Sequence, residues 1–150
     1  MRKALIVIQA EQISDAKIEH LDTLIQKHYR DHVVSEKLLT IWNTLPKGQA
    51  FTDYEDSRSS MITMECPNNF PQESRVAMLT SLERDWRTVT GQNPHQVMLA
   101  LVEETLFADV FNSNKQRLSP IGRLCLVLKV LSSFVRARLT GSPISFNPNL

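Results

Sequence analysis

The stretch SMITMECPNNFPQESRVAMLTSLERDWRTVTGQNPHQVMLALVEE, residues 60–104, decides the fold of this chain. It opens with a short apolar run at residues 61–64 and closes with a second one at residues 97–102. Between the two runs, apolar residues recur at helical spacing, namely Val76, Leu79, Leu82, Trp86 and Val89. Pro71 suits the first position of such a helix, and Gly91 suits a left-handed residue at its end. The stretch therefore predicts a β-α-β unit with a right-handed crossover.

The beginning of the chain repeats this pattern. Residues 4–8 form a β-branched, apolar run that predicts a buried strand. Ser14 suits the N-cap of a helix that ends near Val33, and one face of this helix collects Ile18, Leu21, Leu24, Ile25, His28 and His32. Residues 37–42 predict another strand, and the polar residues 46–60 predict a loop or hairpin. We therefore predict an α/β fold in which two tandem β-α-β units, residues 3–45 and 60–104, form a four-stranded sheet with two helices on one face.

The rest of the chain follows a different pattern. Residues 105–118 are expected to be irregular, and Ser119-Pro120 predicts the start of a C-terminal helix at residues 119–140. Its middle, residues 124–131, is apolar on most faces, but four basic residues interrupt the segment and argue against a membrane span. Such a helix needs cover, so we expect it to pack between subunits or over a sheet. A helix lying on a membrane surface is the alternative.

The composition is that of an ordinary soluble protein. The chain has 150 residues, 42% apolar and 22% charged, which suits a single domain over residues 1–150. The net charge of +1 hides an asymmetry: residues 1–109 carry 11 Lys and Arg against 16 Asp and Glu, whereas residues 110–150 carry six basic residues and no acid. We expect the basic segment to meet an acidic surface, its own or a partner's. The acidic first part argues against a nucleic-acid partner.

No motif predicts a metal or cofactor. Cys66 and Cys125 lie far apart without a CxxC pair, and His20, His32 and His95 lack partners at metal-ligand spacing. Glycine-rich phosphate loops are absent. The first ten residues form too short an apolar run for a signal peptide. We therefore expect a cytoplasmic protein that needs neither metal nor cofactor.

Two short stretches resemble the tautomerase superfamily, in particular its long-chain, cis-3-chloroacrylic acid dehalogenase-like subgroup. The first is Val89-Thr90-Gly91-Gln92-Asn93-Pro94-His95-Gln96-Val97-Met98, which is similar to the family's helix end, polar link and strand. The second is Ile13-Ser14-Asp15-Ala16-Lys17, which resembles its first helix start. The resemblance covers residues 3–110. It implies a homotrimer of fused repeats that acts on a small carboxylic acid.

The resemblance also implies a catalytic apparatus that this sequence departs from. The related enzymes use an amino-terminal proline as base or acid and arginines after the third strand to hold a substrate carboxylate. This chain begins Met1-Arg2-Lys3, its first proline is Pro46, and the loop at residues 66–70 has no arginine before Arg75. We therefore predict that the catalytic proline and the arginine clamp are missing.

Three residues remain candidates for catalysis, each with a structural alternative. His28 falls where the subgroup keeps a histidine, but it also suits a partly buried core position. Glu103, followed by Glu104, could activate water at the end of the fourth strand, or could be solvated or paired. Met1 could act through its amine. Two hypotheses follow: isomerase or hydratase-type proton transfer on a small organic acid, or a non-catalytic binding or assembly protein.

Overall fold

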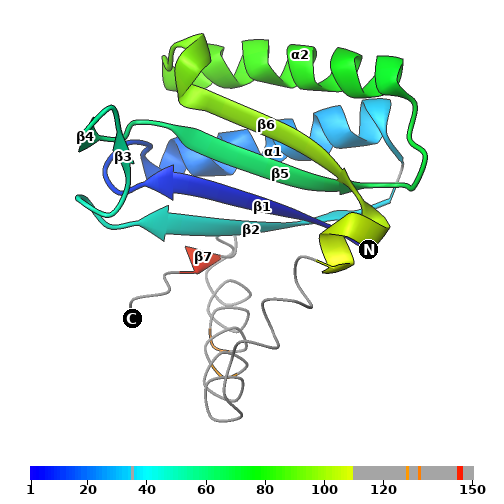
Figure 1. Ribbon diagram of the computed structural model, residues 1–150, viewed down its shortest axis with the longest axis horizontal. Helices are drawn as coiled ribbons and strands as arrows, with labels where there is room; N and C mark the ends of the chain where they lie inside the picture. Colours follow the sequence, from blue (N-terminus) through cyan, green and yellow to red (C-terminus); the bar gives the residue numbers. More distant parts are fainter. Residues whose placement is uncertain (35, 110–127, 129–131, 133–144, 147–150) are drawn as a thin grey trace.

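The computed structural model describes residues 1–34, 36–109, 128, 132 and 145–146 (Figure 1). Its elements are β1 (Arg2–Gln9), α1 (Asp15–His32), β2 (Leu38–Leu45), β3 (Phe51–Thr52), β4 (Glu55–Asp56), β5 (Ser60–Cys66), α2 (Gln72–Thr90), the 3-10 turn η1 (Pro94–Gln96), β6 (Val97–Glu103) and β7 (Ser145–Phe146). The predicted α/β fold with two tandem β-α-β units is confirmed.

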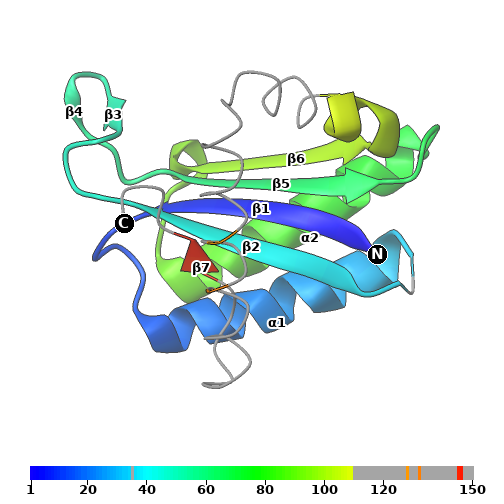
Figure 2. The same ribbon diagram turned by 90° about the horizontal axis from the view of Figure 1, so that it is seen from below.

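The sheet has the strand order β6-β5-β1-β2-β7. Within each unit the strands are parallel, β1 with β2 and β5 with β6, while β1 and β5 join the units as an antiparallel pair. Figures 1 and 2 show α1 and α2 side by side on one face of the sheet. This topology places the starts of β1 and β2 at the same end of the sheet as the ends of β5 and β6.

The core lies between the sheet and the two helices. Alternate residues of β1, Ala4, Ile6 and Ile8, are buried, as the period of a strand requires. The buried positions of α2 are Met78, Leu82 and Trp86, each four residues from the next. Val76, predicted for this stripe, is instead 53% exposed. The buried face of α2 follows the four-residue spacing of Met78, Leu82 and Trp86, and Val76 does not lie on this face.

The helix boundaries follow the predicted residues closely. Ser14 is the N-cap of α1, although its side chain makes no capping hydrogen bond. Pro71 occupies the N-cap of α2 rather than its first turn. Gly91 ends α2 in the left-handed conformation with φ 78°, and its N–H donates to the Arg87 carbonyl at 2.8 Å. A glycine adopts this conformation without the strain that a Cβ would bring.

Gln92, directly after Gly91, is a buried amide that joins four segments. Its Oε1 accepts from Trp86 Nε1 at 2.8 Å and from Ser60 Oγ at 3.1 Å. Its Nε2 donates to the Arg58 carbonyl at 2.7 Å and to the Gln96 carbonyl at 3.3 Å. One side chain thus ties the end of α2 to β5 and to the links before β5 and β6.

Other described segments lie outside the two units. The joining residues form the predicted hairpin, whose strands β3 and β4 make a separate two-stranded sheet. Residues 105–118 were predicted to be irregular, but residues 104–109 are helical, and the first turn is held by Asn68 Oδ1, which accepts from Thr105 N and Oγ1. The long-range contact with Asn68 supplies a hydrogen-bond acceptor for the first helical turn that the local sequence does not provide.

No helix among the described residues is long and apolar enough to cross a membrane.

The predicted C-terminal helix, residues 119–140, lies outside the described residues except for Leu128 and Ser132. Both are helical, and Leu128 is 58% exposed. Beyond it, β7 adds a fifth strand that the sequence did not predict. Its two residues pair in parallel with Trp42 and Asn43 of β2.

Candidate functional site

Charged side chains gather where the start of β1 meets the ends of β5 and β6. The antiparallel register sets Ala4 opposite Met64, which brings the first residues of β1 beside the end of β5. The parallel register sets Cys66 opposite Glu103, which brings the end of β6 to the same place. We call this group the strand-end cluster; it comprises Met1, Arg2, Lys3, Glu36, Glu65, Arg75, Glu103 and Glu104.

Arg75 is the most firmly held member of the strand-end cluster. Its Nη2 donates to Glu103 Oε1 at 2.6 Å, and its Nη1 donates to the Leu101 carbonyl at 3.2 Å. Its Nε donates to the Phe70 carbonyl at 3.1 Å. All three guanidinium nitrogens therefore have partners within the chain. The Arg75 side chain thereby connects the first turn of α2 to the end of β6.

Arg2, at the start of β1, is also paired with a carboxylate of the chain. Its Nη1 donates to Glu104 Oε2 at 3.1 Å, and its side chain is only 15% exposed. The amine of Met1 lies 3.9 Å from Glu36 Oε2, but both of these side chains are more than half exposed. An exposed pair at that distance contributes little to stability. The arginine pair is the stronger contact because a charge-assisted hydrogen bond accompanies it.

Glu65 is a buried carboxylate in the strand-end cluster. It accepts a hydrogen bond from the backbone N–H of Lys3 at 3.1 Å, and Lys3 Nζ lies at 3.8 Å. Its own carbonyl accepts from Tyr29 Oη at 2.5 Å. Burial raises the pKa of Tyr29 well above its usual range, so the hydroxyl stays a neutral donor. Neither Glu65 nor Tyr29 was predicted, although a glutamate inside the apolar run of residues 60–66 is a signal that could have indicated it.

Cys66 is buried beside the same cluster. Burial raises the pKa of its thiol, and the nearby Arg75 only partly opposes this effect. Because the thiolate is the nucleophilic form of cysteine, Cys66 is an inert core residue at neutral pH.

His28 does not belong to the strand-end cluster. It is 5% exposed and lies between α1 and α2, with Nε2 donating to Asp85 Oδ2 at 3.0 Å and Nδ1 3.1 Å from Ser81 Oγ. Its ring stacks on His32, with centroids 6.1 Å apart. The pKa of Asp85 is lowered, first by the hydrogen bond from Arg84 and then by His28. These contacts indicate the structural alternative, a core histidine that joins the two helices.

The His28→Asn variant is expected to lower the free energy of unfolding by about 1–3 kcal/mol, because the shorter amide cannot reach both Asp85 and Ser81. Urea unfolding monitored by circular dichroism would measure the loss. The exposed His95→Asn is the matched control and should change stability by less than about 0.5 kcal/mol. Equal stability of the two variants would contradict the structural role of His28.

Several solved structures are similar to this fold of two tandem β-α-β units. The structure of native Ps01740 matches with a TM-score of 0.62 at 19% identity, covering 67% of this chain and 92% of that one. N1, a member of the cis-3-chloroacrylic acid dehalogenase family, matches with 0.61 at 15% identity, over 67% and 73%. A fused 4-OT symmetric trimer matches with 0.56 at 12% identity, over 67% and 84%. The chain has the tautomerase fold. No protein-family model and no curated protein sequence matches it.

In this tautomerase fold, the three predicted site residues do not all lie in one place. Met1 and Glu103 lie at the same end of the sheet, in the strand-end cluster, whereas His28 lies between the helices. Glu103 is already paired with Arg75, whose Nη2 lies 2.6 Å from its Oε1. No group of three His, Cys, Asp or Glu side chains within the described part of the chain could hold a metal ion.

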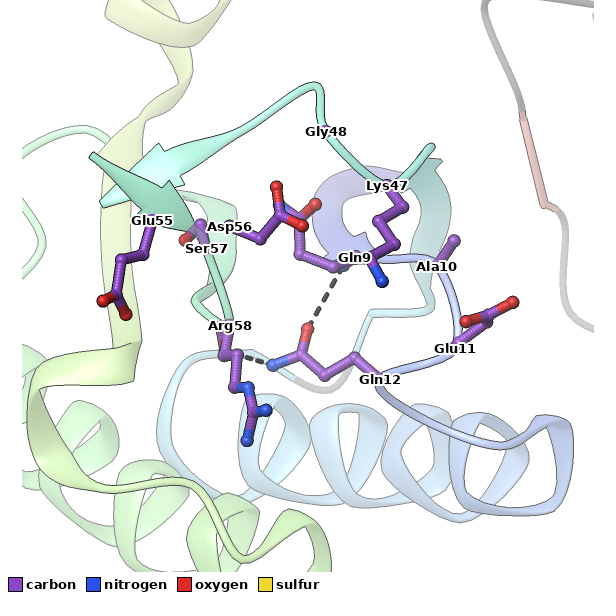
Figure 3. A pocket seen from close by; sticks show the side chains of 10 residues that line it. All are labelled: Gln9, Ala10, Glu11, Gln12, Lys47, Gly48, Glu55, Asp56, Ser57 and Arg58. Atoms are coloured by element: carbon purple, nitrogen blue, oxygen red, sulfur yellow. Dashed lines mark hydrogen bonds between the residues drawn. The ribbon is translucent and has the colours of Figure 1, made fainter. Parts of the chain in front are cut away.

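A polar groove lies at the opposite end of the sheet (Figure 3). It is lined by Gln9, Ala10, Glu11, Gln12, Lys47, Gly48, Glu55, Asp56, Ser57 and Arg58. Gln12 holds its inner wall together, because its Oε1 accepts from the Gln9 N–H and its Nε2 donates to the Arg58 carbonyl. None of the predicted site residues reaches this groove. The charged residues that line it are exposed and of both signs, so the groove presents an ordinary solvated surface.

Proposed function

We propose that this chain is a non-catalytic binding or assembly protein on the tautomerase fold, in which the strand-end cluster stabilises the structure. The observation that carries this proposal is that both arginines of the cluster are bonded to carboxylates of the chain itself. Arg75 donates to Glu103 at 2.6 Å and Arg2 donates to Glu104 at 3.1 Å. The predicted absence of a catalytic proline points the same way.

A carboxylate ligand would have to displace these internal partners. A group attached to the same chain competes at an effective concentration on the order of millimolar or higher. Arg75 also donates to two backbone carbonyls that no ligand would replace. The binding free energy that a small organic acid in solution gains by entering the strand-end cluster is therefore small.

The proposal predicts that small carboxylic acids bind only after the internal carboxylates are removed. Titration of the native chain with pyruvate, followed by calorimetry or NMR, should show no saturable binding below about 10 mM. A Glu103→Gln/Glu104→Gln variant, with both guanidinium groups freed, should gain binding at least about tenfold tighter. The Glu55→Gln/Asp56→Gln variant of the exposed hairpin is the control and should behave like the native chain. Millimolar binding to the native chain that is lost in Arg75→Met would overturn the proposal.

For assembly we propose a homotrimer. The support is the similarity to a fused 4-OT that forms a symmetric trimer, together with exposed apolar side chains on β5 and β6. Met61 is 39% exposed and Met98 is 59% exposed, and the two are register partners on β5 and β6. Light scattering should give three times the chain mass of 17.1 kDa. Met98→Lys should shift the protein to the monomer, and Val76→Lys, on the outer side of α2, should not. A monomeric native chain would contradict the proposed trimer.

One observation favours the enzymatic alternative, proton transfer on a small organic acid. Met1 and Glu103, an amine and a carboxylate, lie at the same end of the sheet. Such chemistry would require the Glu103 carboxylate to separate from Arg75, so Arg75→Met should raise a Glu103-dependent rate. If the cluster has only a structural role, Arg75→Met should lower the stability of the protein without producing such a rate.

As the location of this protein we propose the cytoplasm, since Cys66 is a free thiol.

A further inference from the structure

We propose that the polar groove at the carboxyl ends of β1 and β2 binds a small zwitterion, a free amino acid with a polar side chain. The inference goes beyond the function proposed above and does not depend on it, because the groove and the strand-end cluster lie at opposite ends of the sheet. The groove is solvated in the free chain, and the ligand replaces that solvent by contacts with side chains of both charges.

The groove lies where parallel strands usually present a ligand. β1 and β2 run parallel with Gln9 opposite Leu45, so both strands end at the same edge of the sheet. The Ala10 N–H still donates to the Leu45 carbonyl at 2.8 Å. Beyond this bond the two chain segments separate into the loop before α1 and the loop before the β3–β4 hairpin (Figure 3). Open α/β sheets bind ligands in the crevice outside the carboxyl ends of their strands.

The space between the two loops has the size of a ligand site and is bounded by well-held walls. Its volume is about 570 Å³, which suits a small molecule. On one side, Gln12 Oε1 accepts from the Gln9 N–H at 3.2 Å, and Gln12 Nε2 donates to the Arg58 carbonyl. On the other side, the Ser57 N–H donates to the Ala50 carbonyl at 2.9 Å and closes the hairpin. Walls that are already held do not have to be ordered when a ligand binds.

The charged side chains of the groove are not paired with one another. Two bases and three acids line it, namely Lys47, Arg58, Glu11, Glu55 and Asp56. Within the described part of the chain, none of these five side chains forms an ion pair. Opposite charges do pair elsewhere on the surface, as Lys27 does with Asp31. Both signs of charge therefore remain available to a ligand in one groove.

Lys47 and Asp56 are the two charges that a zwitterion would bridge. Figure 3 shows both side chains on the same side of the hairpin as Gln9, whereas Glu55 extends to the other side. This difference follows from the period of a strand, because Glu55 and Asp56 are consecutive residues of β4. The ligand carboxylate would face the Lys47 ammonium, and the ligand ammonium would face the Asp56 carboxylate. The Gln9 amide beside them can donate to or accept from a polar side chain of the ligand.

The lining disfavours other classes of ligand. Among the described residues that form it, no hydrocarbon side chain is larger than that of Ala10, so an apolar molecule would find no cover. A ligand with only negative charge would meet the carboxylates of Glu11, Glu55 and Asp56. A ligand with only positive charge would meet Lys47 and Arg58. A zwitterion is the class that both signs of charge attract.

Calorimetric or NMR titration of the full chain with L-glutamine tests the proposal. The native chain should show saturable binding with a Kd below about 10 mM. N-Acetyl-L-glutamine lacks the ammonium group and L-glutaminamide lacks the carboxylate, so each should bind at least about tenfold more weakly. The absence of saturable L-glutamine binding below about 10 mM, or equal binding of either blocked analogue, would overturn the proposal. Pyruvate has no ammonium group, so this result is independent of the pyruvate titration above.

Variants show whether the binding takes place in this groove. Lys47→Met and Asp56→Asn each remove one charge and should weaken the binding of L-glutamine at least about tenfold. Lys27→Met and Asp31→Asn, the same changes at an exposed pair on α1, are the matched controls and should leave the affinity within about twofold. Circular dichroism would establish that all four variants are folded. Equal affinities of the groove variants and the control variants would contradict the assignment of the ligand to this groove.

Discussion

Gln92→Leu is expected to lower the free energy of unfolding by about 3 kcal/mol, one of the largest effects of any single substitution in this chain. Leucine keeps the volume but offers no hydrogen bond. The indole N–H of Trp86 and the hydroxyl of Ser60, both in buried residues, would lose their acceptor. The carbonyls of Arg58 and Gln96 would lose their donor. A buried polar group without a partner costs about 1–3 kcal/mol, and solvent can reach only some of these four.

Urea unfolding followed by the fluorescence of Trp86 and Trp42 would measure this loss. The two rings stack with centroids 6.1 Å apart, so their emission reports on the same region. Gln96→Leu is the matched control, since within the described part of the chain the Gln96 side chain accepts a hydrogen bond only from the exposed Asn93 N–H. It should cost less than about 1 kcal/mol. Equal losses for the two variants would show that Gln92 is not the centre of this network.

The second large effect concerns catalysis. The native chain is expected to convert phenylenolpyruvate at least 100-fold, and up to about 10,000-fold, more slowly than a tautomerase with an amino-terminal proline. This corresponds to about 3–5 kcal/mol of activation barrier. The reason is the predicted absence of an amino-terminal proline, together with the pairing of Arg75 with Glu103 and of Arg2 with Glu104. The two enzymes would be compared at the same pH, temperature and substrate concentration.

A residual rate needs its own control, because trace contaminants can mimic weak activity. Glu103→Gln should leave any residual rate unchanged if Glu103 is only the partner of Arg75. A rate within about tenfold of the proline-bearing enzyme would overturn the proposed loss of catalysis. A residual rate that disappears in Glu103→Gln would instead favour the enzymatic alternative.

Much of the fold could be predicted from local patterns. The apolar, β-branched run at residues 4–8 and the helical spacing of apolar residues that includes Leu82 and Trp86 are signals carried by neighbouring residues. Gly91 ends α2 because a left-handed residue favours glycine in any context. The sequence alone therefore determined the two β-α-β units, their order along the chain and the ends of their helices.

Other features depended on contacts between distant residues. The contacts of His28 could not be predicted, because its ring meets Asp85 only through the packing of α1 on α2. Arg75 was one turn too far along the chain for the expected clamp, but the parallel pairing of β5 and β6 brings Glu103 to it. The helix at residues 104–109 forms where Asn68 accepts its first hydrogen bonds. Only the tertiary structure could decide these points, because the partners lie 28 to 57 residues apart along the chain and meet only when the sheet has formed.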